Sequence, residues 1–124
     1  MACVLVADDE AGDREVMAAI LAEAGHELHL AADGSEALRI FSRRPIDVVV
    51  TDIVMPGHDG VELILDLKRL DPEAEVVAIS GKGDTGLHFA NLAGASVVLK
   101  KPVSADALVA AVERIVSDDP SASR

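Results

Sequence analysis

Aromatic residues are almost absent from this chain. It has no tryptophan, no tyrosine and only two phenylalanines among 124 residues. A flavin site is therefore excluded, because there are too few rings to stack on an isoalloxazine. Cysteine is equally scarce: the single Cys3 rules out an internal disulfide, and its place in an apolar run predicts a thiol buried in the core.

Basic residues are also few. Eleven lysines and arginines face 22 acidic residues, giving a formal net charge of −11. Such a balance argues against direct binding to nucleic acid or to an anionic membrane surface. No apolar stretch approaches the roughly 20 residues of a membrane span, and the N-terminus has no charged region ahead of a hydrophobic one. The sequence predicts a cytoplasmic protein.

The length and apolar content suit one folded domain. Half of the residues are hydrophobic, enough to bury a core without disulfides or structural metals. We expect the domain to occupy residues 1–117, followed by a polar tail at residues 118–124. Neither a repeat nor a linker interrupts it.

Short apolar runs alternate with helical patterns along the chain. The predicted strands are residues 3–7, 27–31, 46–51, 75–80 and 96–100. They lack polar alternation, as strands covered on both faces do. Strands separated by helices imply right-handed crossovers and an α/β fold with a doubly wound parallel sheet.

Capping residues and apolar stripes locate the helices. Gly25, Pro45 and Asp71-Pro72 end the first three, Asp33 with Glu36 forms a variant capping box for the second, and Ser104 caps the last. A fourth helix is weakly supported, because glycines crowd its start. The expected buried stripes of the first, third and last helices are Val16, Met17, Ile20, Leu21 and Ala24; Val61, Ile64 and Leu65; and Leu108, Val109, Val112, Ile115 and Val116.

Polar residues follow several of the predicted strands. Asp8 and Asp9 follow the first, Asp52 the third, Ser80 closes the fourth and Lys101 follows the fifth. Strand ends of a parallel sheet meet at one edge, where ligands bind such folds. Three converging carboxylates repel unless a cation such as Mg²⁺ lies among them. With a lysine beside the ion, the pocket suits a phosphoryl group.

The same residues carry a family resemblance over almost the whole chain. The motifs are Val4-Leu5-Val6-Ala7-Asp8-Asp9-Glu10, Asp52-Ile53-Val54-Met55-Pro56-Gly57 with Asp59-Gly60, Ala78-Ile79-Ser80-Gly81, and Lys100-Lys101-Pro102. Together they resemble the receiver domains of bacterial two-component response regulators. The resemblance implies a flavodoxin-like (βα)5 fold, a three-layer sandwich with a five-stranded parallel sheet in the order 2-1-3-4-5.

The resemblance also implies roles for individual residues. Asp52 is the expected phosphoacceptor, receiving a phosphoryl group from a phosphohistidine. Asp9 and Asp8 are expected to hold Mg²⁺ with Asp52 and the backbone carbonyl of Val54. Ser80 and Lys101 are expected to bind the phosphoryl oxygens. A cis peptide is expected between Lys101 and Pro102, and adjacent strand residues point to opposite faces, so Lys101 rather than Lys100 should enter the pocket.

A stand-alone receiver that switches a protein interaction is the favoured function, and the module is not expected to be an enzyme beyond assisting its own phosphorylation and dephosphorylation. The implied partners are a sensor histidine kinase or a histidine phosphotransfer protein, and a downstream protein target, with the chain a monomer or weak homodimer. Two alternatives stay open. One is the receiver portion of a longer transcriptional regulator; the other, less favoured, is a Mg²⁺-dependent phosphohydrolase, which usually needs an acidic residue at the position of Val54.

Some positions depart from the family pattern. Val98 stands where many receivers carry the aromatic ring that switches rotamer, so we expect activation to act through residues 81–86 and the fourth helix. The expected output face includes Leu87, His88, Asn91, Val98, Lys100 and residues of the last helix. Histidines 26, 29, 58 and 88 show no metal-ligand spacing and are predicted to be surface residues.

Overall fold

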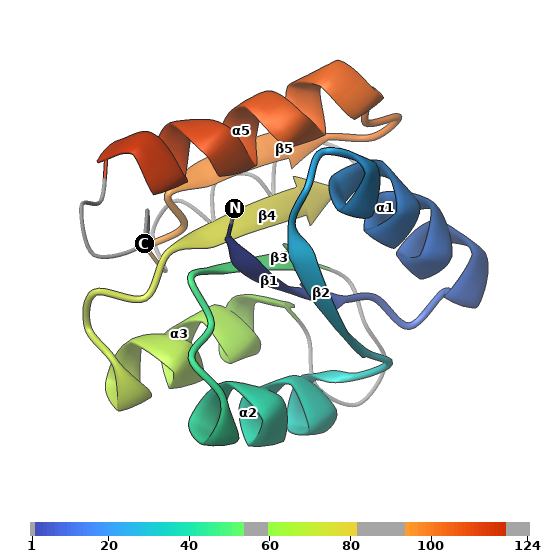
Figure 1. The fold of residues 1–124 in the computed structure, drawn as a ribbon. Coiled ribbons are helices and arrows are strands. Elements are labelled where there is room, and N and C mark those ends of the chain that lie inside the picture. The colour runs from blue at the N-terminus through green and yellow to red at the C-terminus, as the bar shows by residue number, and fades with distance from the viewer. Residues whose placement is uncertain (1, 54–59, 82–93, 119–124) are drawn as a thin grey trace.

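Five parallel strands form a single sheet in the order β2-β1-β3-β4-β5 (Figure 1). The computed structural model describes residues 2–53, 60–81 and 94–118. The strands are β1 (Cys3–Ala7), β2 (Glu27–Ala31), β3 (Val48–Asp52), β4 (Val76–Ser80) and β5 (Val97–Lys100). The described helices are α1 (Ala11–Glu23), α2 (Gly34–Arg43), α3 (Gly60–Leu70) and α5 (Ala105–Asp118). The predicted fold class and strand order are confirmed.

The helices cover both faces of the sheet. Helices α1 and α5 lie on one face, and α2 and α3 on the other (Figure 1). Val4 and Val6 of β1 pack toward α1 and α5, whereas Leu5 and Ala7 pack toward α2 and α3. Burying one valine or leucine side chain completely stabilises the folded state by about 1.5–3 kcal/mol. Burial on both faces explains why the strands read as continuous apolar runs.

Local capping confirms several predicted helix ends. The Asp33 carboxylate accepts the Glu36 N–H at 2.8 Å, and the Glu36 carboxylate accepts the Ala32 N–H at 2.7 Å, closing the variant capping box. Ser104 Oγ accepts the Ala107 N–H at 3.0 Å. Gly25 has a φ of 96°, a left-handed conformation that favours glycine after a helix.

Three strands begin later than predicted. The third strand begins at Val48 rather than at residue 46 and continues through Asp52, which pairs with Ile79 in the ladder. The fourth begins at Val76 and the fifth at Val97. At this last boundary the Ser96 N–H donates to Val76 O at 2.8 Å, while Ser96 Oγ accepts the Val76 N–H at 3.2 Å and donates to Glu75 at 2.7 Å, so a hydroxyl takes the place of a carbonyl acceptor.

Three residues of the predicted apolar stripes are exposed, and one of them is Ala24, which follows the last residue of α1. Val16 of α1 is 59% exposed and Leu65 of α3 is 43% exposed. Met17 and Leu21 in α1 and Ile64 in α3 are buried as predicted, and Leu63 and Leu67 of α3, which were not in the predicted stripe, are buried as well. Helical periodicity places a stripe to within one residue, and the angle at which the helix meets the sheet decides its edge.

Cys3 and His26 also differ from expectation. Cys3 is only half-buried and donates to Glu27 Oε2 at 3.6 Å, so it is not a core thiol. Partial burial, followed by the Glu27 charge and hydrogen bond, raises the pKa of Cys3 to about 11. His26 is buried rather than on the surface, because its Nδ1 accepts the Ala2 N–H at 3.1 Å.

Within residues 2–53, 60–81 and 94–118, every helix is too short or too polar to cross a lipid bilayer. The last helix ends at Asp118, and the rest of the expected polar tail lies outside the described residues.

Candidate functional site

The predicted site residues gather at the edge of the sheet where the strands end. Asp8 and Asp9 directly follow β1, and Asp52 and Ser80 are the last residues of β3 and β4. Lys101 follows β5, and its backbone N–H donates to Ser80 O at 2.8 Å. Residues from four parts of the sequence thus meet in one place.

Three carboxylates form the centre of this site. Oxygen atoms of Asp8, Asp9 and Asp52 all lie within 4.8 Å of one another. Asp8 and Asp52 are buried, whereas Asp9 is exposed. We refer to these three residues as the acidic cluster. The expected convergence of the carboxylates is confirmed.

Asp8 is the most deeply buried member of the acidic cluster. Its Oδ1 accepts the Glu10 N–H at 2.9 Å, but its buried Oδ2 has no hydrogen-bond partner within residues 2–53, 60–81 and 94–118. Burial raises the pKa of Asp8; the Glu10 N–H opposes this shift and the charge of Asp52 adds to it. A buried carboxylate oxygen without a donor, beside two further carboxylates, is suited to bind a hard divalent cation such as Mg²⁺.

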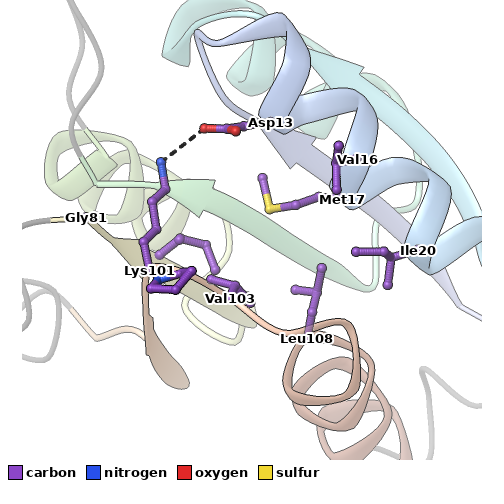
Figure 2. Close-up of a pocket in the computed structure, with 10 residues that line it drawn as sticks. Asp13, Val16, Met17, Ile20, Gly81, Lys101, Val103 and Leu108 are labelled. Carbon is purple, nitrogen blue, oxygen red and sulfur yellow. Dashed lines mark hydrogen bonds and ion pairs between the residues drawn. The ribbon is translucent and has the colours of Figure 1, made fainter.

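Lys101 supplies the positive charge of the site. Its Nζ lies 2.9 Å from Asp52 Oδ2 and 3.4 Å from Asp13 Oδ2, and Figure 2 shows the second contact. Burial alone would lower the pKa of Lys101, but the hydrogen bond and charge of Asp52 outweigh it and raise the pKa. The lysine therefore remains an ammonium group.

The choice between the two adjacent lysines is confirmed. Lys100 is exposed and pairs with Ser80 in the ladder, while Lys101 points toward Asp52. The Lys101–Pro102 peptide is cis, as expected.

Ser80 is nearly inaccessible, with 2% of its surface exposed. It ends β4, the strand beside β3, and the residue before it, Ile79, pairs with Asp52. The serine is thus one residue beyond the Asp52 pairing, and on the other side of β4 it pairs with Lys100, the residue before Lys101. In this position the Ser80 hydroxyl is suited to donate a hydrogen bond to a group bonded to the Asp52 carboxylate.

Asp13 is a site residue that the motifs did not indicate. It lies in the first turn of α1, and it lines an open pocket of about 520 Å³ beside Lys101 (Figure 2). Val16 and Met17 of α1, together with Val103 and Leu108, form much of the apolar lining. An acidic residue one helical turn beyond Asp9 was the only sequence signal for this contact.

Several expectations fall outside the described residues. These are the Val54 carbonyl, the segment 82–86 with the fourth helix, and Leu87, His88 and Asn91 of the expected output face. Of the remaining named positions on that face, Val98 is half-buried and packs on the core beside α2 and α3, and Lys100 is exposed.

Comparison with known proteins agrees with this geometry. The family model described as response regulator receiver domain matches residues 4–113. A DNA-binding transcriptional regulator NtrC from Azospirillum brasilense is 34% identical over 120 residues, covering 95% of this chain and 25% of the relative. A receiver domain structure from Clostridium thermocellum superposes with a TM-score of 0.88 at 35% identity, covering 95% of this chain and 96% of that one.

The receiver domain of NtrX from Brucella abortus is similarly close, with a TM-score of 0.89 at 36% identity, covering 94% of this chain and 99% of that one. The chain spans between about a quarter and a half of the length of the curated relatives it matches, for example 25%, 42% and 50% of three of them.

Proposed function

Because this chain belongs to the family of response regulator receiver domains, which are signalling modules of two-component systems, we propose that Asp52 is its phosphoacceptor. The observation that carries the proposal is the contact of Asp52 Oδ2 with Lys101 Nζ at 2.9 Å, beside the carboxylates of Asp8 and Asp9. A nucleophilic carboxylate, an ammonium group and an acidic cluster are the parts that phosphoryl transfer to an aspartate requires.

In the proposed reaction an oxygen of Asp52 attacks the phosphorus of the donor and forms an acyl phosphate, while the donor keeps the electron pair of the bond that breaks. Negative charge spreads over the three equatorial oxygens of the phosphoryl group. Lys101 stabilises that charge from one side, and the Ser80 hydroxyl donates to the same oxygens. Their contribution is electrostatic and depends on their being held in position.

Asp8, Asp9, Asp52 and the backbone carbonyl of Val54 would hold Mg²⁺. When bound, Mg²⁺ would neutralise part of the negative charge of the acidic cluster and would offset the charge of the phosphoryl oxygens. The unpaired Oδ2 of Asp8 supports this set, because a buried carboxylate oxygen without a donor is costly unless a cation meets it.

We propose that the donor is a phosphohistidine on a sensor histidine kinase or a histidine phosphotransfer protein. Phosphorylation then changes the binding of a downstream protein.

Intact mass spectrometry with acetyl phosphate tests the proposal. With Mg²⁺ the chain should gain the mass of one phosphoryl group, and the gain should disappear in Asp52→Asn and when the ion is chelated. Asp33→Asn is the matched control, since it makes the same chemical change at an exposed helix cap and should still be phosphorylated. A full phosphoryl gain in Asp52→Asn would refute the assignment.

A further inference from the structure

A second cluster of ligating side chains lies at the opposite end of the first two strands. It consists of Cys3 from β1 and of Glu27 and His29 from β2. Cys3 pairs with Glu27 in the parallel ladder, and His29 is two residues farther along, so its side chain is on the same face as that of Glu27. The sheet itself therefore brings together residues that are 24 and 26 positions apart.

The three ligand atoms are close enough to share one ion. His29 Nε2 lies 2.9 Å from Glu27 Oε2, Cys3 Sγ lies 3.6 Å from the same oxygen, and all three atoms are within 4.8 Å of one another. In a tetrahedral zinc site, bonds of about 2.0–2.3 Å separate neighbouring ligand atoms by about 3.3–3.8 Å. Small side-chain rotations would bring the three atoms to those separations.

On the side away from β2, the Cys3 backbone is held by Asp47, the residue directly before β3. Asp47 Oδ2 accepts the Cys3 N–H at 2.8 Å, and the Asp47 N–H donates to Cys3 O at 2.8 Å. The Glu27 N–H donates to Ala2 O at 2.9 Å. The cysteine and glutamate therefore start from a backbone already fixed by hydrogen bonds.

Access and ligand number also suit an ion. The His29 side chain is 18% exposed and the Glu27 side chain 59% exposed, so one side of the cluster is open to solvent. Three protein ligands with an open fourth position for water form a common arrangement around zinc. The cluster's own hydrogen bonds pair Glu27 with His29 well, but they leave the thiol with only a long contact.

We propose that Cys3, Glu27 and His29 form a binding site for a borderline divalent ion of the zinc class, separate from the acidic cluster. Sulfur and imidazole nitrogen ligands favour such ions, whereas the all-oxygen acidic cluster favours Mg²⁺. On binding, the metal replaces the thiol proton, which passes to solvent. The two sites stand at opposite ends of the five-residue strand β1, about 16 Å apart at about 3.3 Å per residue.

Cobalt titration tests this directly, because Co²⁺ substitutes for zinc and shows a thiolate-to-metal charge-transfer band. The chain has one cysteine, so any such band reports Cys3. In excess Mg²⁺, the band should saturate at one equivalent of Co²⁺ with micromolar protein, and added Zn²⁺ should abolish it. Cys3→Ser should eliminate the band, and His29→Gln and Glu27→Gln should each weaken binding at least tenfold.

Asp8→Asn is the matched control, because it alters the acidic cluster and should leave the cobalt band unchanged. If Cys3→Ser does not fold, alkylation of the unmodified chain gives an independent answer: Zn²⁺, but not Mg²⁺, should protect the thiol. Absence of the band, or a band that neither His29→Gln nor Glu27→Gln weakens, would overturn the proposal.

Discussion

Replacing Asp8 by asparagine should stabilise the protein when no divalent ion is present. Among the residues that the structure describes, the buried Oδ2 of Asp8 has no hydrogen-bond partner, and it is close to the charge of Asp52. Leaving such an oxygen unpaired costs about 1–3 kcal/mol. An amide at this position removes one of the repelling charges and can donate a hydrogen bond to Asp52. We therefore expect the free energy of unfolding in chelator to rise by about 1–3 kcal/mol.

Mg²⁺ should reverse this order. An ion that binds only the folded state adds about 2.7 kcal/mol at one hundred times its dissociation constant. The wild-type chain keeps the full acidic cluster and should gain most of this amount, whereas Asp8→Asn should gain less. At saturating Mg²⁺ the wild type should therefore be at least as stable as Asp8→Asn.

The difference in unfolding free energy between the wild type and Asp8→Asn should also depend on pH, in a direction that the pKa of Asp8 determines. Because the pKa of Asp8 is raised in the folded state, the unfolded chain ionises first as the pH rises. Below the ordinary aspartate pKa of about 4, Asp8 is protonated in both states and burying its carboxyl group carries no charge penalty. Above that pH the wild type loses stability relative to Asp8→Asn. Lowering the pH should therefore reduce the difference in unfolding free energy between Asp8→Asn and the wild type in chelator.

Urea unfolding at several pH values, with chelator and with Mg²⁺, measures all three effects. Asp33→Asn is the control, because aspartate and asparagine cap helices about equally well and this site is exposed. The reasoning is refuted if Asp8→Asn is less stable than the wild type in chelator, or if Mg²⁺ stabilises both chains by the same amount.

Three further predictions concern neighbouring contacts. Lys101→Ala removes the ammonium group 2.9 Å from Asp52, so phosphorylation by acetyl phosphate should slow by about 10²–10³-fold, measured by mass spectrometry over time. Asp13→Asn frees Lys101 from a competing ion pair of about 0.5–1 kcal/mol, so the same rate should rise about two- to fivefold; an unchanged rate would deny the competition. Asp33→Ala removes the cap of α2 and should lower stability by about 1 kcal/mol in urea unfolding, whereas Asp33→Asn should not.

Much of the fold could be predicted because its signals are local. The apolar runs give buried strands, Gly25 ends α1 in a left-handed conformation, and Asp33 and Ser104 cap α2 and α5 as expected. Strand boundaries were less predictable: just before β5, the Ser96 hydroxyl accepts the Val76 N–H, a bond that a strand carbonyl would otherwise accept. Such competition between side chain and backbone depends on a neighbour that is distant in the sequence.

The acidic cluster was predictable for a different reason. Asp8, Asp9, Asp52 and Lys101 each stand next to a strand end, and a parallel sheet brings all such ends to one edge. Topology alone therefore predicts their meeting. The contact of Asp13 with Lys101 did not follow from topology, because it depends on the direction in which a helical side chain points.

The sequence by itself determined the alternation of strands and helices, the strand ends that carry the acidic cluster, and the family to which the chain belongs, because all three are written in short local patterns. The tertiary structure alone decided which side chains from distant segments touch. It left Val16 exposed, it buried Asp8 Oδ2 with no hydrogen-bond donor in the described part of the chain, and it placed Cys3 beside Glu27 and His29. These outcomes depend on the register of β1 with β2 and on the packing of α1, since spacing along the chain does not record distances across a sheet.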